Sequence, residues 1–251
     1  MVQQIAVLFD LDGVLTPTAE LHMRAWSDVF TPWCAAHGVS PYSSQDYFDY
    51  IDGKPRYEGV AAFLASRHVT LPWGSPSDEP GQATVCALGN AKDGLVNEIF
   101  EREGIVPYDG SVRLVDQVCQ RGALVAVVSS SKNAPGVLAA AGLADRFAVV
   151  VDGNVAAARG LAGKPAPDTY LYAAQLLGVD PRWCVVVEDA ISGVEAGRRG
   201  GFGWVVGVDR GTGGKALLEV GADTVVYDLS EIDAAALLAL LPGGRLRGGA
   251  A

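Results

Sequence analysis

Two pairs of carboxylates directly follow short apolar runs in this chain. Asp10 and Asp12 come after residues 5–9, and side chains two apart in an extended segment point to the same side. Glu188 and Asp189 are consecutive and follow a run of valines. This second pair suits Mg²⁺, which prefers one or two carboxylates together with waters and phosphate oxygens. Taken alone, a pair of acids is also common at a solvated strand end.

Two further segments carry groups of the kind that bind phosphate. Residues 127–133 run from apolar residues into hydroxyl groups and backbone amides that open a helix, an arrangement that holds phosphate oxygens. A serine-rich helix cap explains the same residues. Lys164 lies between Gly163 and two prolines, a rigid setting that suits a fixed point charge, although a surface loop is the more common place for such a lysine. The occurrence of all four segments in one chain weighs against these alternatives.

Regular elements must bring these four segments together. Short apolar runs alternate with Ala- and Leu-rich stretches of helical period, which predicts an α/β fold with a doubly wound, Rossmann-like parallel sheet. The expected strands cover residues 5–9, 124–128, 148–151, 184–187, 204–208 and 224–227. The expected helices include residues 110–119, 134–141, 168–177 and 192–199. Ligands bind at the carboxyl ends of the strands in such sheets, and the polar segments stand there.

One long segment interrupts this alternation. It holds four of the seven Phe and all three His, with helix-like stretches and few strand-like runs. We expect residues 18–103 to form a mainly helical cap, inserted after the first strand and packed over the carboxyl edge of the sheet. Residues 1–17 and 104–242 are then the α/β core, and residues 243–251 are a flexible C-terminal tail.

Composition restricts the class of protein and its partners. The chain has 251 residues, 49% of them apolar and 19% charged, which excludes wholesale disorder. Its net charge of −10 argues against a nucleic acid or an anionic membrane as partner. No run approaches the roughly 18–20 apolar residues of a membrane span, and the N-terminus lacks the pattern of a signal peptide. We therefore expect a cytoplasmic protein.

The four segments, in this order and each after a predicted strand, resemble the motifs of the haloacid dehalogenase superfamily. The resemblance covers the whole chain, with the cap as the usual insertion. It implies phosphoryl transfer through a covalent aspartyl-phosphate, with Asp10 as nucleophile and Asp12 as general acid and base. Lys164 would neutralise charge and Ser129 would hold the transferring group. The resemblance places four residues at Mg²⁺, namely Asp10, Asp12 (through its backbone carbonyl), Glu188 and Asp189.

Residues 10–22 resemble more closely the β-phosphoglucomutase branch of that superfamily. There a cap arginine grips the distal phosphate of a bisphosphorylated sugar, at the position of Arg56, and a cap lysine contacts the sugar, at the position of Lys92. His22 matches a hinge histidine that positions the acid and base, with an ordinary half-buried helix histidine as an equal alternative. The resemblance implies substrate contacts by Thr18, His22, Gly53, Arg56, Lys92, Ser129, Ser130, Ser131, Lys132 and Asn133.

Two positions depart from the pattern of this branch. Pro17 stands where the family usually has Asp, at the junction of core and cap, and proline fixes φ there. Gly59 stands where a serine often completes the cap's phosphate grip. Neither departure removes a catalytic group.

The resemblance implies a monomeric, Mg²⁺-dependent β-phosphoglucomutase. It would interconvert β-D-glucose 1-phosphate and glucose 6-phosphate through the aspartyl-phosphate and β-glucose 1,6-bisphosphate. One alternative is a phosphatase on the same scaffold that hydrolyses a small sugar phosphate or another phosphometabolite. Arg56 and Lys92 favour the mutase, because a hydrolase needs no second phosphate site. A non-catalytic sensor of phosphorylated ligands is the other alternative, and the intact catalytic positions argue against it.

Overall fold

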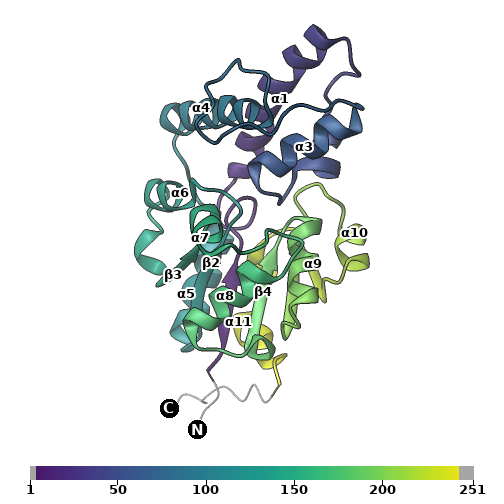
Figure 1. The fold of residues 1–251 in the computed structure, drawn as a ribbon. Helices are drawn as coiled ribbons and strands as arrows, with labels where there is room; N and C mark the ends of the chain where they lie inside the picture. Colours follow the sequence, from purple (N-terminus) through teal and green to yellow (C-terminus); the bar gives the residue numbers. More distant parts are fainter. Residues whose placement is uncertain (1–3, 243–251) are drawn as a thin grey trace, which may run out of the picture.

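The computed structural model describes residues 4–242, so the expected tail at 243–251 lies outside the described residues. Its centre is a six-stranded parallel sheet with the strand order β3-β2-β1-β4-β5-β6 (Figure 1). The strands are β1 (Ala6–Phe9), β2 (Leu124–Val128), β3 (Val149–Val151), β4 (Cys184–Glu188), β5 (Trp204–Val208) and β6 (Thr224–Val226). Each expected strand is confirmed to within one residue at either end.

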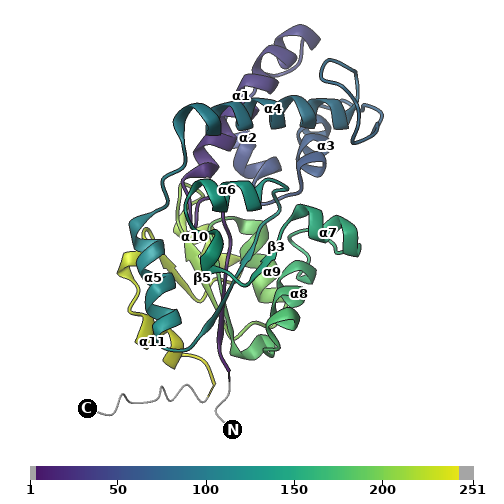
Figure 2. The same cartoon turned by 90° about the vertical axis from the view of Figure 1, so that its left-hand side faces the viewer.

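Both faces of the sheet are covered by helices, as the continuous apolar strands predict. Alternate residues of β1 serve the two faces: Val7 and Phe9 belong to one apolar core, and Ala6 and Leu8 to the other. The first core includes α5 (Asp109–Gln120), α6 (Ala134–Ala140) and α11 (Ala234–Ala239). The second includes α8 (Asp168–Leu177), α9 (Ile191–Arg199) and α10 (Gly214–Glu219), with α7 (Gly153–Arg159) at its edge. Figure 2 shows α5 and α11 on one side of the sheet and α8 and α9 on the other.

Residues 18–103, between β1 and α5, form a helical layer above the carboxyl ends of the strands (Figure 1). Its elements are α1 (Thr18–His37), α2 (Ser44–Asp46), a π-helical turn (Tyr47–Ile51), α3 (Arg56–Ser66) and α4 (Val85–Glu103). They enclose a separate apolar core in which the ring of Phe30 lies 4.0 Å from that of Phe63. We propose the ends of this helical segment, Thr18 and Glu103, as the boundaries of the cap.

Two linkers join the cap to the core and touch each other. The outgoing linker covers residues 10–17, and the returning linker covers residues 104–108. The backbone N–H of Tyr108 donates to the carbonyl of Leu15 at 3.0 Å, and Ser111 Oγ donates to the carbonyl of Val14 at 2.6 Å. The linkers therefore meet at the edge where the motifs stand. Across residues 4–242, no helix combines the length and apolar character needed to cross a membrane.

Candidate active site

A cavity of about 310 Å³ lies between the cap and the carboxyl ends of the strands. Every residue that the sequence analysis placed at the site lines this cavity except Thr18 and Lys164. From the cap and the outgoing linker come Asp10, Asp12, His22, Gly53, Arg56 and Lys92. From the end of β4 and the loops after β2 and β4 come Ser129, Ser130, Ser131, Lys132, Asn133, Glu188 and Asp189.

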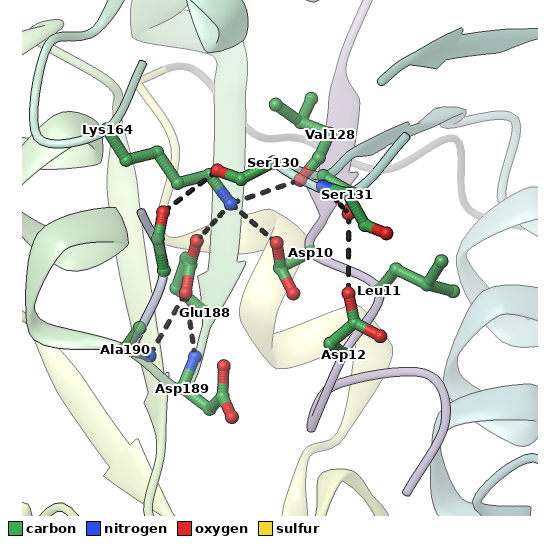
Figure 3. Close-up of polar contacts among 12 residues, drawn as sticks. Asp10, Leu11, Asp12, Val128, Ser130, Ser131, Lys164, Glu188, Asp189 and Ala190 are labelled. Atoms are coloured by element: carbon green, nitrogen blue, oxygen red, sulfur yellow. Dashed lines mark hydrogen bonds and ion pairs between the residues drawn. The ribbon is translucent and has the colours of Figure 1, made fainter. Parts of the chain in front are cut away.

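The amine of Lys164 lies between two of the carboxylates (Figure 3). Its Nζ is 2.5 Å from Asp10 Oδ1 and 2.5 Å from Glu188 Oε1, and it donates to the carbonyl of Val128 at 3.1 Å. Burial opposes the charge of this amine, but the two carboxylates outweigh it and raise the pKa of Lys164. The lysine is therefore a permanent cation at the end of β1.

Glu188 is held by donors on both of its carboxylate oxygens. Besides Lys164, Tyr170 donates its hydroxyl to Oε1 at 3.0 Å, and the backbone N–H groups of Asp189 and Ala190 donate to Oε2 at 3.0 and 3.1 Å. A Cβ at Gly193 would stand 1.8 Å from Oε1, so only glycine fits against this carboxylate. Glu188 is consequently rigid and largely compensated in charge.

Asp189 has the opposite character, and it defines a cation site. Oxygens of Asp10, Glu188 and Asp189 lie within 4.8 Å of one another. Asp189 is 6% exposed, yet within residues 4–242 no donor hydrogen-bonds to its carboxylate. Burial, with the nearby charges of Asp52 and Glu188, raises the pKa of Asp189. Burying an unpaired carboxylate is costly unless a cation compensates it, so this donor set fits a hard, oxygen-seeking metal ion.

Asp12 lies apart from that cluster and faces other partners. Ser129 Oγ lies 3.4 Å from Asp12 Oδ2, and Thr18 Oγ1 donates to Oδ1 at 2.5 Å. Thr18 is fully buried behind Asp12 and does not reach the cavity. The first turn of α1 directs this hydroxyl to the acid, and the expected contact between Thr18 and the substrate stays a prediction.

His22 connects Asp12 to the cap. Its Nδ1 contacts the Nζ of Lys92, and its Nε2 lies 3.5 Å from Asp12 Oδ1. Burial and the charge of Lys92 lower the pKa of His22 to about 4, so the ring is neutral at pH 7. Burial and Arg56 lower the pKa of Lys92 to about 7. We assign the hydrogen of the ring to Nε2, because Nδ1 accepts from Lys92.

The far end of the cavity holds an ion pair that the sequence analysis did not select. Arg56 Nη2 is 2.5 Å from Asp93 Oδ1, and Asn133 Nδ2 donates to the same oxygen at 2.8 Å. Asp93 thus joins a cap arginine to the loop after β2. In the sequence, the one indication that Asp93 belongs to the site is its position directly after Lys92.

A second acid was also missed. Asp52 lines the cavity, and burial together with the charge of Glu188 raises its pKa to about 7. The carbonyls of Asp52 and Gly53 accept hydrogen bonds from Ser192 Oγ at 3.2 Å and Ser130 Oγ at 2.8 Å. This cap loop therefore rests on the loop after β2 and on the first turn of α9, a contact that no local sequence pattern indicates.

Three comparisons relate the chain to known proteins. The profile of the haloacid dehalogenase-like hydrolase family matches residues 6–201. The chain is 47% identical over 239 residues to a β-phosphoglucomutase of Mycobacterium tuberculosis, covering 90% of both sequences. It is 33% identical over 225 residues to hexitol phosphatase A of Escherichia coli, covering 90% of this chain and 91% of that one. The crystal structure of a β-phosphoglucomutase from Clostridium difficile has the same fold, with a TM-score of 0.76 and 23% identity over 95% of this chain and 97% of that one.

Proposed function

The chain belongs to the haloacid dehalogenase-like hydrolase family and to its β-phosphoglucomutase-like branch, and we propose that it interconverts β-D-glucose 1-phosphate and glucose 6-phosphate. The observation that carries this proposal is the presence of basic side chains at both ends of the site. Lys164 stands beside Asp10 at the core end, and Arg56 and Lys92 stand at the cap end. An intermediate with two phosphate groups needs such a site at each end, and the guanidinium of Arg56 suits a bidentate grip on one of them.

Asp10 is the proposed nucleophile. Once it is phosphorylated, it gives its phosphoryl group to the 6-hydroxyl of β-D-glucose 1-phosphate, and Asp12 takes the proton of that hydroxyl. The resulting β-glucose 1,6-bisphosphate turns round in the cavity. Asp10 then attacks the phosphorus on C1 while Asp12 returns the proton to the leaving oxygen, which releases glucose 6-phosphate and restores the aspartyl-phosphate.

Charge compensation makes this attack feasible. A carboxylate and a phosphoryl group repel each other, and Lys164 offsets both because it is fixed 2.5 Å from Asp10. Mg²⁺, held by the carboxylates of Asp10, Glu188 and Asp189 and by the carbonyl of Asp12, would offset further negative charge on the transferring group. The buried, uncompensated carboxylate of Asp189 supports this part of the proposal.

The cap also controls the acid and base. Lys92 on α4 contacts His22 Nδ1, and His22 Nε2 lies 3.5 Å from Asp12 Oδ1. These contacts support a role for the closed cap in positioning the acid. Closure excludes water, which would otherwise hydrolyse the aspartyl-phosphate before the sugar turns. We further propose that Gly53 in the cap and Ser129, Ser130, Ser131, Lys132 and Asn133 in the core contact the substrate. All these groups come from one chain, so a monomer suffices.

A coupled assay separates the mutase from the phosphatase. The protein is given β-D-glucose 1-phosphate, Mg²⁺ and a trace of glucose 1,6-bisphosphate, and both glucose 6-phosphate and free phosphate are followed. We expect glucose 6-phosphate in large excess and loss of all turnover in Asp10→Asn. Free phosphate as the main product would instead favour a hydrolase like the hexitol phosphatase relative.

The cap arginine gives an independent comparison. Arg56→Ala should weaken the mutase reaction far more than hydrolysis of a simple phosphate ester, because only the bisphosphate reaches the cap end. Arg102→Ala is the matched control, since Arg102 lies on α4 and pairs with Glu103 at the surface. Equal losses on both substrates in Arg56→Ala would contradict the second phosphate site.

A further inference from the structure

One loop outside all four motifs contacts both carboxylate-bearing loops. This loop, residues 209–213, connects β5 to α10. Arg210 Nε donates to the carbonyl of Gly13 at 2.8 Å, and Thr212 Oγ1 donates to the carbonyl of Asp189 at 3.4 Å. The carboxylate of Asp209 fixes the loop internally, because its Oδ1 accepts from two backbone N–H groups of the loop at 3.0 Å.

The guanidinium of Arg210 lies between the two linkers of the cap. Its carbon is 3.9 Å from the centre of the Tyr108 ring, at the end of the returning linker. Its Nη1 donates to the carbonyl of Tyr227 at 2.9 Å, while Nε holds Gly13 in the outgoing linker. Only a planar group with several donors can serve two carbonyls and stack on an aromatic ring at once, so lysine cannot replace it.

Gly13, whose carbonyl accepts from Arg210, also lies against the cation site. A Cβ at Gly13 would stand 1.8 Å from Asp189 Oδ2, so the backbone here lies directly against that carboxylate. Gly13 also follows Asp12, and its N–H donates to the carbonyl of Thr16 at 2.8 Å. A shift of the Gly13 peptide would therefore move the Asp12 carbonyl and the space available to Asp189 together.

We propose that Arg210 and Thr212 are positioning residues that hold the Asp12 and Asp189 loops in register for cation binding and phosphoryl transfer. Arg210 also ties this register to the returning linker of the cap through Tyr108. Neither residue lines the cavity, so neither touches the substrate. The inference rests on the proposed function, because it presumes a cation and a reaction at this site.

Arg210→Lys tests the proposal, with Arg182→Lys as the matched control. Arg182 is a surface residue whose guanidinium, among the residues that the structure describes, pairs with Asp180 alone, away from the site. Binding of Mg²⁺ is measured by calorimetry without substrate, and kcat and KM are measured separately. Loss of an outer-shell partner typically costs 10- to 100-fold in metal affinity or activity. We expect a rise of that size in the dissociation constant of Mg²⁺ and a similar fall in kcat, with KM changed less than about threefold.

An unchanged Mg²⁺ affinity and kcat in a folded Arg210→Lys protein would overturn the proposal. If this variant fails to fold, Thr212→Val decides, because it removes the other contact and keeps the shape of the side chain. A several-fold weaker binding of Mg²⁺ supports the inference, and unchanged binding contradicts it.

The two proposals fail in different ways. If the unaltered protein lacks mutase activity but Arg210→Lys still weakens Mg²⁺ binding, the positioning role stands and the reaction must be reassigned. If the mutase activity is present and Arg210→Lys changes neither constant, the positioning role alone is wrong.

Discussion

Replacement of Lys164 by methionine should destabilise the metal-free protein strongly. Methionine keeps most of the length of the side chain but removes the ammonium group, which lies 5.0 Å from the centre of the Tyr170 ring. Asp10 and Glu188 would then be buried without their cation. Removing one partner from a buried ion pair typically costs about 3–5 kcal/mol, and two carboxylates place this site near the upper end.

Protonation sets a limit on that cost. The ordinary pKa of an aspartate carboxyl is 3.8, and burial raises the pKa of Asp10 well above it even beside Lys164. A stranded carboxylate therefore takes up a proton at a cost of no more than about 1.36 kcal/mol for each pH unit above 3.8. The loss caused by one stranded carboxylate therefore cannot exceed about 5.7 kcal/mol at pH 8 and about 1.6 kcal/mol at pH 5. For a chain of this size, 4–5 kcal/mol corresponds to a fall in Tm of roughly 8–20 °C.

Thermal unfolding in EDTA, at pH 8 and at pH 5, measures the loss of stability at the two pH values for which the limits were given. Lys215→Met is the control, because Lys215 is exposed and its one ion pair within residues 4–242 is with Glu219. This substitution should change stability by less than about 0.5 kcal/mol. Saturating Mg²⁺ should narrow the gap at pH 8, since the added cation compensates part of the charge. A Lys164→Met protein that melts within about 2 °C of the unaltered protein in EDTA at pH 8 would refute the reasoning.

Three further outcomes follow from the site. Gly13→Ala should weaken Mg²⁺ binding at least tenfold by calorimetry, because its Cβ would meet Asp189 Oδ2, whereas Gly122→Ala, at nearly the same φ of about +81° but in open space, should bear only the backbone strain. Burial raises the pKa of Asp52 to about 7, so between pH 4 and pH 7 the folded protein binds more protons than the unfolded chain. The free energy of unfolding in EDTA should therefore fall as pH rises through this window. In thermal melts from pH 4 to pH 8, Asp52→Asn should make this pH dependence of the unfolding free energy less steep. Asp93→Asn removes the carboxylate that occupies the cap arginine, so the KM for β-D-glucose 1-phosphate should fall several-fold in the coupled assay, and a higher KM would contradict this competition.

The sheet and the position of the core motifs were predictable from the sequence. Strands buried on both faces must be continuously apolar, and residues 124–128 and 184–187 have that character. Parallel strands place all their carboxyl ends at one edge, so polar residues that directly follow such runs meet there. Asp10 and Asp189 lie together for this reason, although 179 positions separate them.

The contacts between cap and core depended on the tertiary structure. Thr18 is the first residue of α1, and only the direction of this first turn shows that its hydroxyl faces Asp12. Asp93 acquires its partners, Arg56 and Asn133, only when α3, α4 and the loop after β2 converge. Local patterns carry no information about such convergence.

The contacts of Arg210 also depended on the tertiary structure. It belongs to no motif and sits in a short loop after a predicted strand, where an exposed, solvated arginine is the ordinary expectation. The turn of that loop aims its guanidinium at Gly13 and Tyr108, which lie 197 and 102 positions away. The sequence determined which chemical groups stand at the edge of the sheet, because strand burial and parallel pairing are local and periodic. The folded chain alone decided which of them touch, because those contacts join segments whose separation no periodic pattern records.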